Sequence, residues 1–162
     1  IYERYFADLP DLQNEITAEL NVFERNMQFE YVLGFEDYII QLHQLNVNTA
    51  VVTSSNKQKM QQVYTQHPNF KAYFDHIFTV EDFVKSKPDP YCYLLGASYF
   101  GVKPTECMAF EDSINGFKSV TAAAIPLVGL ATSNSIEVIN QYTRVIIPNY
   151  LQVNFTDLCA AF

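Results

Sequence analysis

The stretch CMAFEDSING at residues 107–116 passes from an apolar run to two adjacent carboxylates and then to a helix start. The run from Cys107 to Phe110 is short and apolar, as is typical of a strand buried in a parallel sheet. Ser113 suits the N-cap of a helix, because apolar residues recur behind it at helical spacing. Glu111 and Asp112 therefore lie at the carboxyl end of a strand, where open α/β sheets bind their ligands.

Composition narrows the class of protein. The 162 residues, of which 49% are hydrophobic, suffice for one globular domain with a sizeable core. A formal net charge of -8 without clustered Lys and Arg argues against a nucleic-acid partner, whereas a small phosphorylated metabolite needs only one or two lysines. No run approaches the roughly 20 apolar residues that span a bilayer, so we expect no membrane partner.

The cysteines indicate a reducing environment. The chain has three of them, Cys92, Cys107 and Cys159, and they show no C-x-x-C spacing. Neither a disulfide framework nor a zinc site is therefore predicted, and we expect a cytoplasmic protein.

Helical and strand patterns alternate along the chain. Apolar residues recur at helical spacing over residues 13–32 and again over 35–46. Short apolar or β-branched runs predict strands at 49–53, 76–79, 107–110, 126–130 and 144–147, with helices between them, one of them at 133–141. This order predicts an α/β fold with a Rossmann-like parallel sheet and helices on both faces.

Polar residues of related chemistry follow three of the predicted strands. They are Thr53, Ser54, Ser55, Asn56, Lys87, Glu111 and Asp112. Because the carboxyl ends of parallel strands meet at one edge of a sheet, we expect them to lie close together. Hydroxyls and amides can hold phosphate oxygens, a lysine can neutralise them, and two carboxylates can hold a hard cation such as Mg²⁺. The combination predicts a phosphoryl-transfer site.

Each piece also has an ordinary structural interpretation. Hydroxyl residues often end a strand and cap a helix. Most surface lysines have no specific role, and Lys85 is a competing candidate for the role of Lys87. Two acids at a helix start are favoured by the helix dipole alone. The histidines, His43, His67 and His76, lack ligand spacing, so structural or surface roles are expected. The order of the pieces along the chain is what favours a site.

That order resembles the haloacid dehalogenase superfamily of phosphohydrolases, over residues 34–147. The segment VVTSSN at 51–56 resembles the second family motif, KSKPDP at 85–90 the third, and FEDSING at 110–116 the fourth. The form of these motifs is similar to the branch that contains β-phosphoglucomutase, sugar-phosphate phosphatases and pseudouridine-phosphate phosphatases.

The resemblance implies a role for each predicted site residue. Thr53 and the amide of Ser54 would bind the phosphoryl group, with Ser55 and Asn56 reaching further into the substrate. Lys87 would be a catalytic residue whose ammonium pairs with both the nucleophile and the phosphate. Glu111 and Asp112 would hold Mg²⁺.

The sequence departs from the family at its first motif, an apolar strand that ends in Asp-x-Asp-Gly and carries the nucleophile. The nearest segment, YFADLPD at residues 5–11, has its acids three apart, a proline between them and no following glycine. We expect that the intact protein has this strand, between the strands that end at Thr53 and Phe110, and that the sequence records only part of it. Residues 1–33 would then be the remnant of a helical cap domain, and residues 34–162 the core.

The implied function is Mg²⁺-dependent hydrolysis of a small sugar or nucleoside phosphomonoester through an aspartyl-phosphate. Phosphoryl transfer of the β-phosphoglucomutase type uses the same core, and a truncated, non-catalytic homologue is an alternative of another class. We expect the 162-residue chain by itself to be inactive, because it lacks the nucleophile. The oligomeric state is left open.

Overall fold

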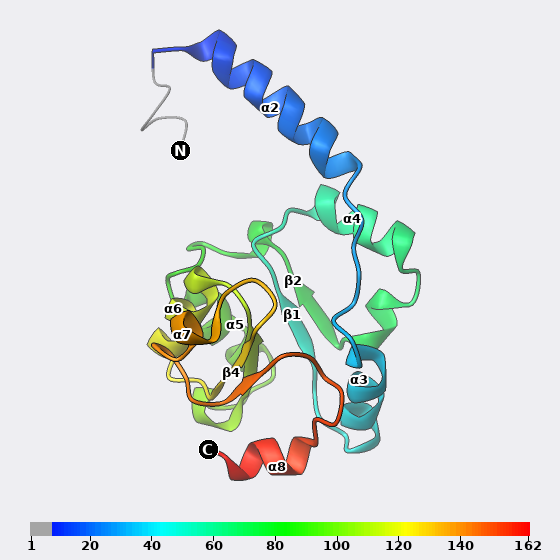
Figure 1. Ribbon diagram of the computed structural model, residues 1–162, viewed down its shortest axis with the longest axis vertical. Helices are drawn as coiled ribbons and strands as arrows, with labels where there is room; N and C mark the ends of the chain where they lie inside the picture. The colour runs from blue at the N-terminus through cyan, green and yellow to red at the C-terminus, as the bar shows by residue number, and fades with distance from the viewer. Residues whose placement is uncertain (1–7) are drawn as a thin grey trace.

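The computed structural model of the protein describes residues 8–162, with side chains for all of these except 21 and 25 (Figure 1). Residues 1–7 of the predicted cap remnant, and with them the first part of the segment 5–11, lie outside the described residues. Helices and strands alternate from residue 35 onward. In chain order the elements are α2 (Pro10–Arg25), α3 (Phe35–Gln44), β1 (Ala50–Val52), α4 (Lys57–Gln66), η1 (Phe70–Tyr73), β2 (His76–Phe78), η2 (Val80–Asp82), α5 (Tyr91–Tyr99), η3 (Pro104–Glu106), β3 (Ala109–Glu111), α6 (Ile114–Ala122), β4 (Leu127–Leu130), α7 (Ile136–Ile139), β5 (Ile146–Ile147) and α8 (Phe155–Ala160).

The strands form two parallel sheets. β1 pairs with β2, so that Val52 lies opposite Phe78, and β3, β4 and β5 pair in that order, so that Glu111 lies opposite Gly129. Within residues 8–162, β1 and β3 are each paired on one side only. The predicted α/β class with parallel strands is confirmed, and between β1 and β3 the sheet is divided.

Helices cover both faces of the larger sheet. Leu127 of β4 belongs to a buried cluster with Phe117 of α6 and Ile139 of α7, whereas the next residue, Val128, packs with α3 and α8. Successive residues of a strand point to opposite faces, so the two clusters lie on either side of β4 (Figure 1). Each fully buried large apolar side chain contributes about 1.5–3 kcal/mol to folding. Burial on both faces explains why these strands are continuous apolar runs.

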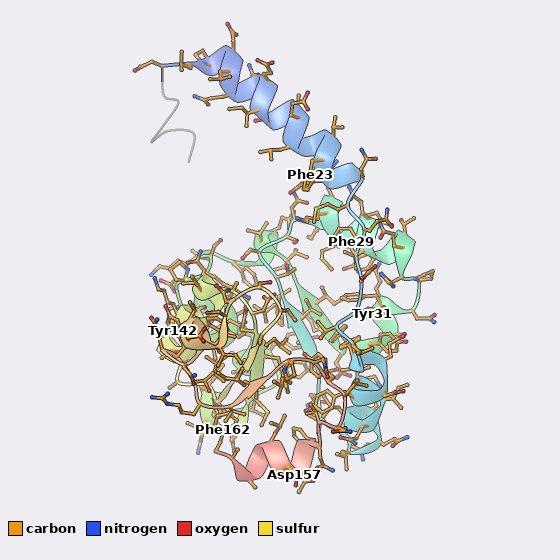
Figure 2. All side chains as sticks on the ribbon, viewed as in Figure 1. Phe23, Phe29, Tyr31, Tyr142, Asp157 and Phe162 are labelled. Atoms are coloured by element: carbon orange, nitrogen blue, oxygen red, sulfur yellow. The ribbon has the colours of Figure 1, made fainter. Side chains whose placement is uncertain are left out.

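The predicted helix at 13–32 is wrong at both ends, since α2 spans Pro10–Arg25. Residues beyond it run along α4 without forming a helix, and Figure 2 labels Phe29 and Tyr31 in this segment. The side chain of Gln66 accepts a hydrogen bond from the Phe29 amide (3.0 Å) and donates one to the Met27 carbonyl (2.9 Å). The ring of His67 contacts the Phe29 carbonyl at 2.6 Å. These bonds satisfy backbone groups that a helix would otherwise pair internally.

The other boundaries differ less. The helix predicted at 133–141 is confined to Ile136–Ile139, because the preceding residues form a loop whose side chains bond to the end of β3. The strand predicted at 107–110 is shifted to Ala109–Glu111, which makes Glu111 its last residue. α2 extends away from the rest of the chain and contacts α4, where Glu24 pairs with Lys59 at 3.4 Å (Figure 1). No helix of residues 8–162 is long and apolar enough to cross a membrane.

Candidate active site

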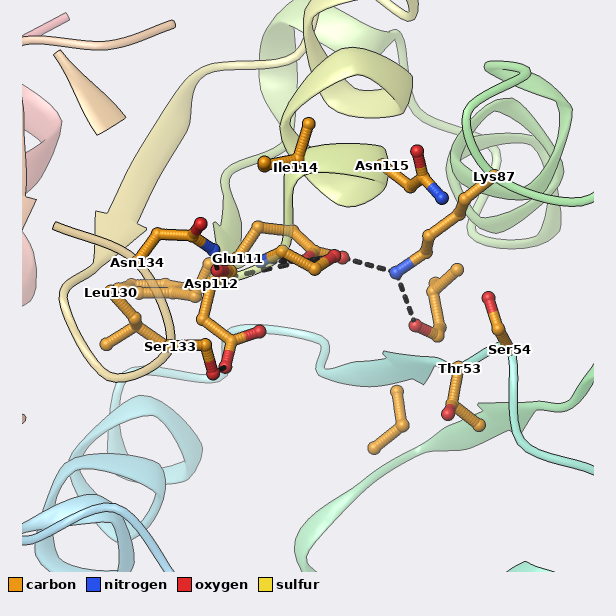
Figure 3. A pocket seen from close by; sticks show the side chains of 14 residues that line it. Thr53, Ser54, Lys87, Glu111, Asp112, Ile114, Asn115, Leu130, Ser133 and Asn134 are labelled. Atoms are coloured by element: carbon orange, nitrogen blue, oxygen red, sulfur yellow. Dashed lines mark hydrogen bonds and ion pairs between the residues drawn. The ribbon is translucent and has the colours of Figure 1, made fainter. Parts of the chain in front are cut away.

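A cavity of about 810 Å³ lies between the ends of β1 and β3 (Figure 3). Its lining consists of Val51, Val52, Thr53, Ser54, Lys87, Phe110, Glu111, Asp112, Ser113, Ile114, Asn115, Leu130, Ser133 and Asn134. The structure thus brings together five of the seven predicted site residues, namely Thr53, Ser54, Lys87, Glu111 and Asp112. Ser55 and Asn56 are not among the lining residues.

The end of β1 turns sharply at Thr53. Its amide bonds to Phe78 of β2 at 3.0 Å, and its side-chain oxygen accepts a hydrogen bond from the amide of Ser55 at 3.1 Å. This is a local hydroxyl-to-backbone turn. Asn56 is the N-cap of α4, because its side chain accepts a hydrogen bond from the backbone amide of Lys59 at 2.8 Å. Asn56 therefore has a structural role as a helix cap, and its contact with the substrate stays a prediction.

Lys87 joins the two sheets. Its ammonium donates to the Val52 carbonyl (3.0 Å), to the Tyr93 hydroxyl (3.1 Å) and to Oε1 of Glu111. An ammonium has three protons, so all of its donors are used by the chain. Lys85, the competing lysine, lies on the surface and pairs with Asp89 at 3.4 Å. Burial and geometry thus distinguish Lys87 from its neighbour.

Glu111 is a buried carboxylate, and both of its oxygens accept hydrogen bonds from other groups of the chain. Its Oε1 accepts hydrogen bonds from Lys87 and Tyr93, and its Oε2 accepts one from the hydroxyl of Ser113 at 3.1 Å. The Ser113 hydroxyl also caps α6, because it accepts a hydrogen bond from the Gly116 amide at 3.0 Å. The carboxylate therefore meets the N-terminus of α6, where the helix dipole favours negative charge. Burial, and next the charge of Glu111, raise the pKa of Tyr93 well above its ordinary value, so its hydroxyl remains a donor at neutral pH.

Asp112 faces the loop at residues 132–134, which was not among the predicted site residues. Its Oδ2 accepts hydrogen bonds from Ser133 (2.6 Å) and Thr132 (3.0 Å), and the Asn134 amide donates to its carbonyl at 2.6 Å. The signal was present in the sequence, since the polar run Thr-Ser-Asn at 132–134 follows the predicted strand 126–130 as Thr-Ser-Ser-Asn follows the first. Tyr93, the other missed residue, had no such signal, because an aromatic residue in a helix is usually part of the core.

The two carboxylates offer oxygen ligands, which suit a hard cation, but they supply only part of a ligand set. Oxygen ligands are what Mg²⁺ prefers. Within residues 8–162, however, no three His, Cys, Asp or Glu side chains group closely enough to hold a metal ion. Oδ1 of Asp112 accepts no hydrogen bond from the described residues, whereas both oxygens of Glu111 do.

The chain belongs to the family of haloacid dehalogenase-like hydrolases, whose model it matches over residues 3–123. The predicted family is therefore confirmed. Validoxylamine A 7'-phosphate phosphatase from Streptomyces hygroscopicus subsp. limoneus is 28% identical over 132 residues, which are 82% of this chain and 55% of that protein. The probable pseudouridine-5'-phosphatase of Drosophila melanogaster is 31% identical over 116 residues, 68% of this chain and 49% of that protein. The chain spans about half the length of these curated relatives.

Solved structures share the fold. A HAD hydrolase of family IA, variant 3, from Entamoeba histolytica superposes with a TM-score of 0.82 at 20% identity, over 94% of this chain and 71% of that one. β-Phosphoglucomutase from Clostridium difficile gives a TM-score of 0.68 at 20% identity, over 80% of this chain and 55% of that one. At this identity the likeness concerns the fold alone.

Substitution of Gly116 by alanine should destabilise the protein. A Cβ at this position would collide with the carboxylate of Glu111, which is held on three sides and cannot move without loss of hydrogen bonds. We expect a loss of about 1–3 kcal/mol in the free energy of unfolding, measured by urea denaturation. Gly96→Ala is the matched control, because its Cβ would approach no atom closer than 3.9 Å, and it should be neutral or stabilising. Equal effects of the two substitutions would contradict the contact.

Removal of one member of the Lys87–Glu111 pair should cost more than removal of both. The side chains are 10% and 8% exposed, so Lys87→Met leaves a buried charge without its partner. A loss of about 3–5 kcal/mol is expected for Lys87→Met, and much of it should return in Lys87→Met combined with Glu111→Gln. Urea denaturation of the two single variants and the double variant measures the coupling. Additivity to within about 0.5 kcal/mol would show that the pair is not coupled.

Proposed function

We propose that the protein is a phosphatase that hydrolyses a small phosphorylated metabolite, such as a sugar or nucleoside phosphate. The observation that carries the proposal is the meeting of Thr53, Lys87 and the Glu111–Asp112 pair in one cavity at the carboxyl ends of parallel strands. Hydroxyl, ammonium and paired carboxylates are the groups that phosphoryl transfer requires. The activities of the named relatives, which act on phosphate esters by name, support the same class of substrate.

The proposal includes a further strand between β1 and β3 that carries the nucleophilic aspartate. Thr53 directs its amide to β2, and alternate residues of a strand direct their backbone groups to opposite sides. The carbonyl of Val52 therefore faces away from β2, and it accepts a hydrogen bond from the ammonium of Lys87. Val51, Val52 and Phe110 give this part of the cavity an apolar lining suited to a strand. A segment outside the 162 residues would supply it, and residues 1–33 would be the remnant of a cap domain.

In this mechanism the aspartate attacks phosphorus, the ester oxygen leaves, and water then hydrolyses the aspartyl-phosphate. The hydroxyl of Thr53 and the amide of Ser54 bind phosphoryl oxygens at the end of β1. The ammonium of Lys87 offsets repulsion between carboxylate and phosphate, and must release one of its three acceptors to do so. Glu111 and Asp112 would hold part of the coordination sphere of Mg²⁺, which neutralises phosphate charge when bound.

Asp112→Ala should abolish Mg²⁺-dependent hydrolysis of p-nitrophenyl phosphate by the complete protein. The substitution removes a carboxylate from the cavity and leaves the buried Lys87–Glu111 pair in place. We expect kcat to fall at least about a hundredfold, because electrostatic groups at such sites contribute factors of this order. Lys85→Ala is the control, because Lys85 is a surface lysine of the segment that contains Lys87, and it should keep full activity. Near-normal turnover of Asp112→Ala would refute the metal assignment.

Two further measurements separate the alternatives. Conversion of β-glucose 1-phosphate to an isomer, instead of release of phosphate, would indicate a mutase. Absence of any turnover in the natural protein would indicate a non-catalytic homologue. A natural mass near the 18.6 kDa of these 162 residues would contradict the additional strand, and a mass several kDa larger is expected.

A further inference from the structure

Tyr93 lies beside the ion pair of the candidate site, and we propose that it is a positioning residue that fixes both Glu111 and Lys87. The inference rests on the proposed function, since it concerns the same cavity. Tyr93 is not among the residues that line the cavity, so it would act through its two partners and not on the substrate.

The contacts form a closed triangle of three polar groups. The Tyr93 hydroxyl donates a hydrogen bond to Oε1 of Glu111 and accepts one from Nζ of Lys87 at 3.1 Å. Lys87 donates directly to the same Oε1 and lies 4.8 Å from the centre of the Tyr93 ring. One side chain thus holds the anion by a hydrogen bond and the cation by a hydrogen bond and its ring face.

The helix α5 fixes the position of this hydroxyl. The Tyr93 ring belongs to the buried cluster that contains Ala109 of β3 and Phe117 of α6. One turn later, Gly96 lies against Val52 and Phe78, which brings α5 close to β1. The hydroxyl is therefore anchored by the core between the two sheets, whereas the lysine it contacts is a long chain with many rotamers.

Loss of the hydroxyl would free both partners to move. In Tyr93→Phe the ring and its packing stay, but Oε1 of Glu111 keeps Lys87 alone, and Lys87 keeps two acceptors. A hydrogen bond to a charged group is worth enough to change binding about tenfold. The position of the Glu111 carboxylate, and with it the affinity of the site for a divalent cation, should therefore depend on this one oxygen.

The test compares Tyr93→Phe with the wild type in the complete protein. Mn²⁺, detected by electron paramagnetic resonance, serves as the metal probe, and its Kd at 10 °C should rise about tenfold in Tyr93→Phe. At saturating metal, kcat for p-nitrophenyl phosphate should fall with little change in KM. Tyr99→Phe is the matched control, because it removes a hydroxyl from the exposed end of the same helix and should change neither value.

The outcomes separate the two proposals. If the wild type binds Mn²⁺ and hydrolyses the ester, and Tyr93→Phe does both equally well, the role of Tyr93 is overturned and the proposed function stands. A lower melting temperature with unchanged Kd would also overturn it, because that result describes a structural residue only. If the wild type neither binds Mn²⁺ nor turns over, the proposed function fails and the role of Tyr93 with it.

Discussion

The ion pair between Lys87 and Glu111 is the interaction on which the rest of the site depends. β1 and β3 share no backbone hydrogen bonds, and Lys87 spans the space between them by bonding the Val52 carbonyl on one side and Glu111 on the other. Taking two charges out of water is costly, and this cost is offset only where the remaining donors and acceptors are satisfied. Tyr93 and Ser113 donate the further hydrogen bonds that the Glu111 carboxylate needs, which explains why the contacts around it are so dense.

Gly116 shows how the local sequence and the pair are linked. Ser113 caps α6 and at the same time donates to Glu111, so the helix start and the carboxylate are built as one unit. The carboxylate occupies the space where any larger residue at 116 would place its Cβ. The spacing of the Glu-Asp-Ser-x-x-Gly segment is therefore a packing requirement of this structure.

The sequence was sufficient wherever the signal is local. Short apolar runs followed by polar residues located the ends of β1 and β3, and hence Thr53 and Glu111, to within one residue of the structure. The end of α2 could not be predicted, because Gln66 and His67, which bind the segment beyond it, lie 37 to 39 residues away in the chain. Tyr93 was missed for a similar reason, since its pattern is that of a core aromatic and only the fold brings its hydroxyl to Glu111.

α4 connects the outlying helix α2 to the end of β1 at the cavity through a series of contacts. The N-cap of α4, Asn56, lies three residues after Thr53. The first turn of α4 contacts Glu24 through Lys59, and its last turn bonds the segment after α2 through Gln66. A displacement of α2 must therefore either break these contacts or carry α4 with it. In the second case the movement would reach Asn56, the N-cap of α4, which lies three residues after Thr53 at the end of β1.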